Sequence, residues 1–217
     1  MDYALLRNSL LFKNMEENEI RSCLRVFKAR ELDCQKNDLI LAAGDNTNSL
    51  GLVLSGSVII ERNDLWGNRI EICKVGKLRL FADTYAVLNN ETLLFDVRAE
   101  SSCRVLLLQI GDINTLARLR EKWTVKFVCN LLMISSLDNL ELSAELFHTK
   151  SKTMRGRILS YLNTVALRTH KREFDIPYNR QQMADYLNVE RSALSGELSR
   201  MQKDGIIKYR KNHFILL

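Results

Sequence analysis

The sequence predicts an α+β protein with an N-terminal antiparallel β-roll of the cupin-like jelly-roll type, a long helix, and a C-terminal winged helix-turn-helix. Three observations carry this prediction. Short apolar runs between turn signals fill residues 30–108, a helical period begins at Ile110, and two short amphipathic helices followed by two short strands end the 217-residue chain. We therefore expect three parts, over residues 1–109, 110–148 and 149–217.

The clearest local pattern lies between Pro177 and Gly205 and indicates two helices joined by a tight turn. Asn179 can cap the first helix through its side-chain oxygen, and Asn188 tolerates the left-handed conformation that the turn needs. Ala184 is small enough for the two helices to cross closely. Apolar residues follow one face of each helix, namely Met183, Ala184 and Leu187 in the first and Leu194, Leu198 and Met201 in the second.

The opposite face of the second helix carries small polar residues beside an arginine: Arg191, Ser192, Ser195, Gly196 and Ser199. A face of this kind can enter the DNA major groove, as the second helix of a helix-turn-helix does. An ordinary helical hairpin packed into a core has the same spacing. The tail favours DNA, because Gly205 stops the helix and the segments IIKYR and HFILL then indicate two strands of a wing.

Positive charge is concentrated in the same part of the chain. Residues Phe147–Leu217 contain 14 Lys and Arg against 6 Asp and Glu, an excess of eight positive charges. The whole chain carries +6, so the first 146 residues carry a small negative charge. Because phosphate binding needs localised positive charge, we expect double-stranded DNA to be the partner of the C-terminal part.

Other classes of site find little support. The chain lacks a run of about 18 apolar residues and a cleavable signal at its start, so we expect no membrane partner and a cytoplasmic protein. No Ser/His/Asp order, phosphate loop or HExxH spacing indicates an enzyme, and the three histidines lack metal-ligand spacing. A redox or iron–sulfur role is the minority alternative for five scattered cysteines that form no CxxC pair: Cys23, Cys34, Cys73, Cys103 and Cys129.

The first half of the chain reads as helices and then strands. Residues 2–29 are expected to form short helices, and one of these helices is expected to begin at Met15–Glu19. From Arg30 to Leu108, apolar runs alternate with turn signals such as Ser55-Gly56. The segment VIIERNDLWGNRIEIC predicts one hairpin. Short, regularly spaced strands are typical of a small antiparallel barrel or roll.

The long helix has two apolar faces. One follows a strict 3-4 spacing through Val125, Val128, Leu132, Ser135, Asn139 and Leu142 to Leu146. A neighbouring face carries Trp123, Phe127, Leu131, Ile134 and Leu137. We expect the second face to pack on the chain's own roll and the first on a twin helix, which makes the protein a homodimer. A helix fully buried in one domain is the alternative. The polar segment around Phe147–Thr153 predicts a hinge.

The order of roll, long helix, hinge and winged helix resembles the CRP/FNR family of bacterial transcription regulators over nearly the whole chain. The stretches NRQQMADYLNVERSALSGEL, MQKDGIIKY and MRGRILSYL resemble that family's DNA-binding domain. The stretches AAGD, LVLSGSVII and DLWGNRIEI resemble its cyclic-nucleotide-binding-type roll. The resemblance implies a signal-sensing roll, a dimerisation helix, a recognition helix on a palindromic promoter site, and RNA polymerase as a further partner.

The resemblance also implies how the DNA contacts are divided. At the start of the first helix, the backbone phosphate would be met by Asn179, Arg180 and Gln181. At the start of the second, base edges would be faced by Arg191, Ser192 and Ser195, and arginine is well suited to bidentate binding of guanine. Arg200 would touch phosphate or an acid within the domain. One departure is Gly196, which stands where many family members carry a second base-reading arginine and which adds no base contact of its own.

The roll departs further from the family pattern. The stretch FADTYAVLNNETLLFDV matches the cassette that holds a cyclic-nucleotide phosphate, with effector-pocket candidates Phe81, Ala82, Asp83 and Leu93. Ala82 and Asp83 stand at the family's Gly-Glu positions and Leu93 stands near its Arg position. Between Leu80 and Val97 there is no Lys or Arg, so an anionic phosphate would lack a charge partner. We expect no cofactor, no cyclic nucleotide, and an effector that the sequence does not name.

The leading hypothesis is thus a homodimeric, sequence-specific transcription regulator. The alternative is a small-molecule-binding regulatory subunit whose C-terminal domain docks protein rather than DNA. The charge distribution and the exposed serine and arginine face favour the first. The sequence leaves open the target genes, the operator, and whether transcription is raised or lowered.

Overall fold

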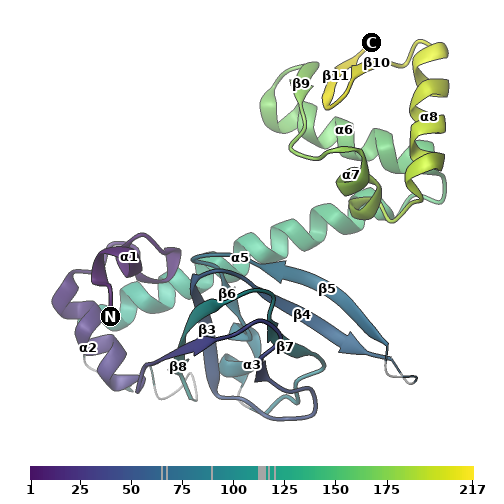
Figure 1. Ribbon diagram of the computed structural model, residues 1–217. Coiled ribbons are helices and arrows are strands. Elements are labelled where there is room, and N and C mark those ends of the chain that lie inside the picture. The colour runs from purple at the N-terminus through teal and green to yellow at the C-terminus, as the bar shows by residue number, and fades with distance from the viewer. Residues whose placement is uncertain (65, 67, 89, 112–115, 117, 120) are drawn as a thin grey trace. The chain divides into compact units, whose positions relative to one another are not determined.

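A computed structural model describes the chain except for residues 65, 67, 89, 112–115, 117 and 120, as Figure 1 shows. The chain divides into two compact units, Met1–Ile134 and Ser135–Leu217, so the boundary falls inside the long helix. Helices and antiparallel sheets build both units, which confirms the predicted α+β class with a roll, a long helix and a winged helix-turn-helix.

The first unit begins with the predicted short helices. These are α1 (Tyr3–Arg7), the 3-10 helix η1 (Leu10–Phe12) and α2 (Glu17–Val26). A capping box starts α2, because the Glu16 side chain accepts from the Glu19 backbone while the Glu19 carboxylate accepts from the Glu16 amide at 2.8 Å. The apolar stripe of α2 is buried in the core of this unit.

Two four-stranded antiparallel sheets form the roll. One has the order β1-β8-β3-β6, with β1 (Arg30–Cys34), β8 (Cys103–Gln109), β3 (Ser49–Ser55) and β6 (Leu80–Phe81). The other has the order β2-β7-β4-β5, with β2 (Leu39–Leu41), β7 (Asp96–Ala99), β4 (Val58–Asn63) and β5 (Arg69–Val75). Val58 pairs with Val75 and Asn63 with Arg69, which confirms the predicted hairpin. Helix α3 (Asp83–Leu88) follows β6.

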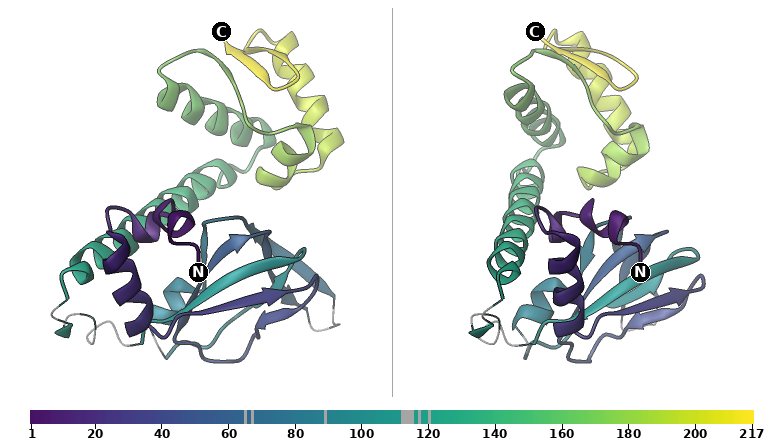
Figure 2. Two further views of the ribbon diagram at one scale, coloured as in Figure 1. Left: turned by 60° about the vertical axis from the view of Figure 1, so that its left-hand side comes forward. Right: turned by 90° about the vertical axis from the view of Figure 1, so that its left-hand side faces the viewer.

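The long helix α5 runs from Trp123 to Thr149. Three residues of its predicted packing face are buried against the N-terminal helices as well as the roll: Trp123, Phe127 and Ile134 share a core with Phe12 and Phe27. The ring centroids of Phe27 and Phe127 lie 4.9 Å apart, and those of Phe27 and Trp123 lie 5.4 Å apart. Figure 2 shows the N-terminal helices beside the first part of α5. The long helix was expected from Ile110 but begins only at Trp123, since Leu119, Glu121 and Lys122 are not helical. Residues 112–115, 117 and 120 of the expected stretch lie outside the described residues.

The second unit contains the rest of α5 and a small α/β domain. Helix α6 (Met154–Thr169) follows a break at the predicted hinge, and Thr153 caps it by accepting from the Gly156 amide at 3.1 Å. Then come β9 (Glu173–Asp175), α7 (Arg180–Tyr186), α8 (Arg191–Lys203), β10 (Ile207–Arg210) and β11 (His213–Leu216). The last two strands confirm the predicted wing, and β9 adds a third strand in the order β10-β11-β9. In the described part of the chain, no helix has the length and apolar character that a membrane crossing requires.

Candidate nucleic-acid interface

The pair α7 and α8 is positioned by two caps and one left-handed residue. The Asn179 side chain accepts from the Gln182 amide at 2.9 Å, and the Gln182 side chain accepts from the Asn179 amide at 2.9 Å, which completes a capping box. Asn188 has φ of 51°, so the predicted left-handed turn is confirmed. The Glu190 carboxylate caps α8 by accepting from the Ala193 amide at 2.8 Å.

The turn between the two helices is held from a third helix. Arg157 of α6 donates from Nη1 to the carbonyl oxygens of Leu187 and Asn188, at 3.2 and 3.0 Å. Its Nε donates to the Ser151 carbonyl at 3.0 Å. These bonds satisfy two carbonyls where α7 ends, so Arg157 fixes the angle between α7 and α8 through the turn itself. Nothing in the local sequence pattern indicates this role.

Packing decides which face of α8 is exposed. Leu194, Leu198 and Met201 are completely buried in a core shared with Ile158, Leu162, Met183 and Phe214, among others. Because the side chains of a helix are fixed relative to one another, burying this stripe leaves Arg191 and Ser192 exposed on the opposite side. The structure thus brings together the residues for which base contacts were predicted, at the exposed start of α8.

The hydroxyls on this face already have partners within the chain. Ser192 donates to the Glu190 carboxylate, and Ser195 donates to the Arg191 carbonyl at 3.0 Å. Glu190 is therefore a residue that the prediction missed: an exposed carboxylate beside the proposed base-reading residues. Its bonds to Ser192 and Ala193 hold its pKa below the usual range, so it stays charged at neutral pH. The signal was present in the sequence, because an acid three residues before Ala193 is a suitable helix cap.

The residues predicted to contact phosphate at the start of α7 differ in their exposure and in their contacts within the chain. Asn179 and Gln181 are exposed, and Gln181 donates to Asp185 at 2.8 Å. Arg180 is half-buried. Its guanidinium lies 5.2 Å from the centre of the Tyr209 ring and donates to the Lys211 carbonyl at 3.1 Å. Arg180 therefore joins α7 to the wing, a contact that its position in the sequence does not reveal.

Arg200 takes part in an ion-pair network. Its Nε lies 3.4 Å from Glu197, whose side chain is largely buried. Arg155 of α6 contacts the same carboxylate at 2.6 Å and Asp204 at 2.8 Å. The expectation that Arg200 touches phosphate or an acid within the domain is thus met, in this structure, by the acid. Gly196 lies beside this arginine, because a Cβ built at Gly196 would be 3.9 Å from the Arg200 guanidinium.

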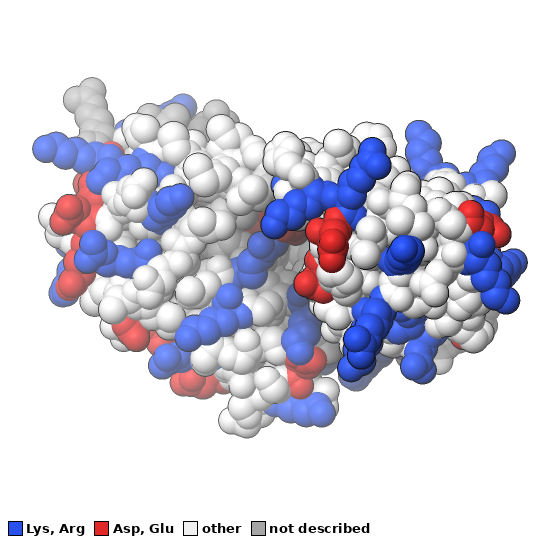
Figure 3. All heavy atoms as spheres, turned by 90° about the horizontal axis from the view of Figure 1, so that it is seen from above, with Lys and Arg blue, Asp and Glu red and all other residues white. Residues whose placement is uncertain are grey.

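On the right-hand part of Figure 3, Lys and Arg side chains are spread among uncharged residues, while Asp and Glu form a few small groups. Exposed basic residues of the wing, Lys208, Arg210 and Lys211, add to those of the two helices. They were not among the predicted contacts, although their charge and their place in the wing could have indicated them. This unit therefore offers a basic surface on which a polyanion can bind.

The predicted effector residues of the roll are packed rather than open. Phe81, Ala82 and Leu93 are all buried in one core cluster. The Phe81 ring fills the space above Gly51, so that any Cβ at this position would overlap the ring. Asp83 is half-buried at the start of α3. Arg98, which follows the cassette directly in sequence, lies 2.7 Å from Glu61 and 3.6 Å from Asp96, so two carboxylates already hold it.

The predicted dimer residues form an exposed stripe on α5. Val125, Leu132, Leu142 and Leu146 are between 62% and 71% exposed, and Val128 is half-buried. Ser135 and Asn139 are exposed between them. The stripe is wider than predicted, because Leu137, which was assigned to the packing face, is 43% exposed. The structure therefore leaves a large apolar surface on this helix.

The end of α5 is tied to the helix-turn-helix by one buried histidine. His148 is 2% exposed, and its ring nitrogens lie 2.7 Å from the Tyr186 hydroxyl and 2.9 Å from the Thr164 hydroxyl. The rings of Tyr161 and Tyr186 pack on it at 5.4 and 5.7 Å. Burial lowers the pKa of His148, and the charge of Arg168 lowers it further. The imidazole is therefore neutral in the folded protein at neutral pH and joins three helices.

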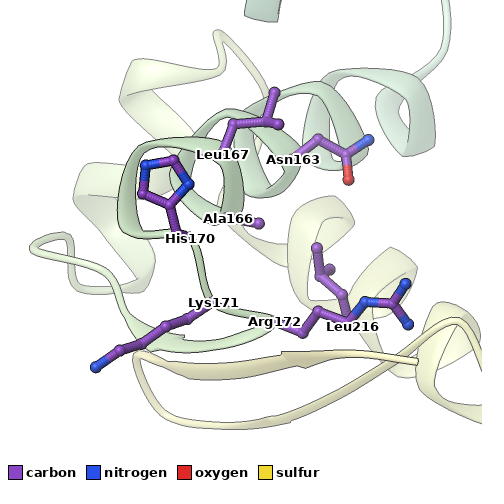
Figure 4. A pocket seen from close by; sticks show the side chains of 7 residues that line it. All are labelled: Asn163, Ala166, Leu167, His170, Lys171, Arg172 and Leu216. Atoms are coloured by element: carbon purple, nitrogen blue, oxygen red, sulfur yellow. The ribbon is translucent and has the colours of Figure 1, made fainter.

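Figure 4 shows a hollow at the end of α6 in the second unit, lined by Asn163, Ala166, Leu167, His170, Lys171, Arg172 and Leu216. The Lys171 side chain points away from Arg172 in this view, so the polar groups do not converge on one centre. A small-molecule site normally combines an apolar hollow with a few converging polar groups. The described residues also contain no group of three or more metal-ligand side chains that could hold a metal ion.

Comparison with protein families gives two matches along the chain. A cyclic nucleotide-binding domain matches residues 31–119, and a Crp-like helix-turn-helix domain matches residues 156–217. The transcriptional activator protein FnrL of Cereibacter sphaeroides is 26% identical, and the match covers 84% of this chain and 74% of the relative. The two matched domains are the predicted roll and the predicted helix-turn-helix.

Solved structures share the fold. The c-di-GMP-responsive global regulator CLP of Xanthomonas campestris is 16% identical, with a TM-score of 0.56 over 93% of this chain and 99% of that one. A putative cAMP-binding regulatory protein from Silicibacter pomeroyi is 19% identical, with a TM-score of 0.52 over 99% of this chain and 93% of that one. At these identities the likeness is one of fold alone.

His148 gives a prediction for stability against pH. Its pKa is lowered in the folded state, so the unfolded chain binds the proton more readily. The contribution of His148 to the free energy of unfolding is therefore fully present above about pH 6.5. It is lost as the pH falls from there through the pKa of the folded state. We expect the urea midpoint of the second unit in the parent protein to fall as the pH is lowered over this range. The His148→Gln variant should lack the part of this fall that protonation of His148 causes.

The control for this experiment is His213. Hydrogen bonds to Asp175 and Glu173 raise the pKa of its exposed ring, so its contribution is present at low pH and lost as the pH rises through the folded pKa. The two histidines thus act in opposite directions, and His213→Gln should leave the acid-side loss in place. An unchanged acid-side loss in His148→Gln would show that another group causes it.

Proposed function

We propose that this chain, which belongs to the CRP/FNR family of transcription regulators, acts as a homodimer on a palindromic DNA site. It is a transcription regulator with a cyclic-nucleotide-binding-like sensor domain and a helix-turn-helix DNA-binding domain, and it is not an enzyme. The observation that carries the proposed mode of DNA binding is the exposed start of α8, where Arg191 and Ser192 stand opposite a fully buried apolar stripe.

The dimensions of α8 suit the major groove. Its 13 residues span roughly 20 Å at about 1.5 Å per residue. The groove is about 12 Å wide and admits one helix, whose first residues reach the base edges. Arg191 is at this end, with Ser192 beside it and Ser195 one turn further on. We assign base contacts to these three residues, and contacts with the phosphate backbone to Asn179, Arg180 and Gln181 at the start of α7.

The exposed stripe of α5 supports the homodimer. Leucines more than 60% exposed recur along it at Leu132, Leu142 and Leu146, in the 3-4 spacing of a coiled-coil seam. Each such side chain is worth roughly 1.5–3 kcal/mol when it is buried, so a second copy of the same helix would stabilise both. Ser135 and Asn139 lie in the same stripe and would set the register of the two helices by hydrogen bonding.

We further propose that the roll senses a signal other than a cyclic nucleotide. Its cassette from Leu80 to Val97 contains no Lys or Arg, and the next cation along the chain, Arg98, is held by Glu61 and Asp96. An anionic phosphate in this cassette would meet Asp83 without a cation supplied by the cassette itself. We place the protein in the cytoplasm with the DNA, and we propose RNA polymerase as a second partner on the resemblance to its family.

Selection from a pool of random double-stranded DNA tests the proposed DNA recognition. The full chain should enrich a palindromic motif with two half-sites about one helical turn apart, because each recognition helix of a symmetric dimer reads one of them. Enrichment of a single half-site would contradict the dimer. Recovery of no motif would contradict base readout by α8 and favour a C-terminal domain that docks protein.

The dimer can be broken at one residue. We expect Leu132→Asp to give monomers in sedimentation and to weaken DNA binding, because a charge placed in an apolar seam loses its hydration. Leu167→Asp is the matched control, because Leu167 is 75% exposed on α6 and lies outside the stripe. A dimeric Leu132→Asp variant, or a parent protein that is monomeric at micromolar concentration, would show that the interface lies elsewhere.

Cyclic AMP and cyclic GMP should bind weakly or not at all, because the cassette lacks a cation for the phosphate. Isothermal calorimetry with the full chain should show no micromolar binding of either nucleotide. If micromolar binding is measured, the proposal for the roll fails. Arg79→Ala and Arg98→Ala would then show which arginine supplies the charge.

Arg191 and Arg180 should differ in what they contribute to DNA binding. Arg191→Ala should cost about 1–3 kcal/mol per half-site and relax the preference at one base position. Arg180→Ala should weaken all sequences about equally and lower the salt slope by about one for each phosphate that the protein no longer neutralises. Competition binding over a library of mutated sites measures both effects.

The control for this pair is Arg172→Ala, which removes the same charge at the end of α6. It should reduce affinity less than either variant and leave base preference unchanged. If Arg191→Ala loses affinity uniformly across the library, Arg191 contacts the backbone instead. Base readout would then fall to Ser192, Ser195 and close approach at Gly196.

A further inference from the structure

Two cysteines face each other directly across the edge of the roll. Cys34 is the last residue of β1 and Cys103 is the first residue of β8, and they are partners in the antiparallel register. They are 7% and 5% exposed and lie in the same core cluster. Both are free thiols in this structure.

The placement of this pair fits the geometry of a disulfide. Residues directly opposite in an antiparallel ladder have Cα atoms about 4.5–5.5 Å apart. A disulfide needs Cα atoms about 4.4–6.8 Å apart. Residues that are direct partners in an antiparallel ladder project from the same face, so both sulfurs lie on one face of the sheet rather than on opposite faces. The bond can therefore form without a change of strand register.

Neighbouring contacts hold the two residues in place. The Ser102 hydroxyl donates to the Gln35 side chain at 3.1 Å, one position beyond the pair. The Asn37 amide donates to the Ala99 carbonyl at 2.8 Å, which ties the turn after β1 to the end of β7. Gly56 lies against Cys103, because a Cβ built at Gly56 would be 2.7 Å from the Cys103 Cβ. The β3–β4 turn is thus packed directly against Cys103.

Access to the thiols comes from their place at the end of an edge strand. The sheet order begins with β1, so β1 has a neighbour on one side only. The last pair of such a ladder is the first to open, because fewer hydrogen bonds hold it than hold a central pair. A small oxidant can therefore reach sulfur atoms that are almost fully covered in the closed state.

We propose that Cys34 and Cys103 form a reversible oxidation site of the roll, at which a hydroperoxide converts the two thiols into one intramolecular disulfide. In the first step the Cys34 sulfur bonds to one peroxide oxygen, the O–O bond breaks, and with hydrogen peroxide one water leaves. In the second step Cys103 sulfur bonds to Cys34 sulfur, the S–O bond of the sulfenic acid breaks, and a second water leaves with the Cys103 proton. Two thiols are oxidised and one peroxide is reduced to two waters.

The roles of the two sulfurs follow from their surroundings. Burial raises the pKa of Cys34, Asp38 and Asp33 raise it further, and a hydrogen bond from Cys103 lowers it again. Burial together with the negative charge on Cys34 raises the pKa of Cys103 to about 11. Cys34 lies on the edge strand β1, whereas Cys103 lies on β8 between β1 and β3 and has Gly56 packed against it. We therefore assign the first attack to Cys34 and the resolving step to Cys103. Because both pKa values are raised, oxidation is slow at neutral pH and accelerates as the pH rises.

The other three cysteines are separate from this pair. Cys23 is a completely buried residue of α2, and burial raises its pKa far above the usual range. Cys73 and Cys129 are exposed, on β5 and α5. These two exposed thiols can be oxidised, or can cross-link two chains, independently of the proposed pair. A background variant with Cys73→Ser and Cys129→Ser removes this reaction and leaves the proposed pair intact.

The test treats this full-length background variant with hydrogen peroxide. The intact mass should fall by that of two hydrogen atoms, and a peptide map under non-reducing conditions should join the peptides of Cys34 and Cys103. Dithiothreitol should restore the mass. The closed loop runs from residue 34 to residue 103, so the oxidised form should also unfold at a higher urea concentration. None of these readouts depends on DNA binding.

A second variant tests the order of the two steps. With Cys103→Ser added, the sulfenic acid at Cys34 has no resolving thiol and should be trapped by a dione reagent. The proposal is overturned if both thiols in the background variant stay reduced under conditions that oxidise Cys73 or Cys129 in the parent. It is also overturned if Cys34 proceeds to sulfinic acid without forming the disulfide.

Discussion

The burial of one apolar stripe on α8 determines how the second unit can meet DNA. Leu194, Leu198 and Met201 are completely buried, and each contributes roughly 1.5–3 kcal/mol through the surface it removes from water. A rotation of α8 by one residue, about 100°, would expose this stripe and turn the polar face into the core. The direction of Arg191 is therefore set by three side chains that are buried in the core. The left-handed Asn188 and the bonds from Arg157 then fix where the helix begins.

Local patterns in the sequence predicted most of this arrangement because each has a local physical cause. Asn179 caps α7 and Asn188 turns the chain wherever the rest of the protein lies, so their roles could be inferred from neighbouring residues alone. Strand β9 was missed because it has three residues and a single buried side chain, Phe174, which is too short for a period to show. Its strand conformation depends on pairing with β11, about 40 positions later.

The sequence could not predict which arginines are already held by other residues of the chain, because this depends on contacts between residues that are distant in the sequence. Arg180 was expected to be a phosphate contact, and the structure places it over Tyr209 of the wing, where burial lowers its pKa. Arg98 directly follows the cassette in the sequence, and the structure pairs it with Glu61 on the neighbouring strand. In both cases the sequence identifies the cation correctly. The element that packs against the cation decides whether the cation can bind a phosphate.

The positively charged residues of the two units have different roles. In the roll, ion pairs such as Arg98 with Glu61 and Lys74 with Glu100 join strands of a filled core, so these cations serve the fold. In the second unit, buried Glu197 draws in Arg155 and Arg200, yet Arg191 and the basic residues of the wing remain exposed. An exposed cation keeps its hydration and exchanges it for phosphate at little cost, whereas a paired one must first leave its carboxylate. The chain's positive charge is therefore available to DNA mainly where the apolar core of the second unit has turned it outward.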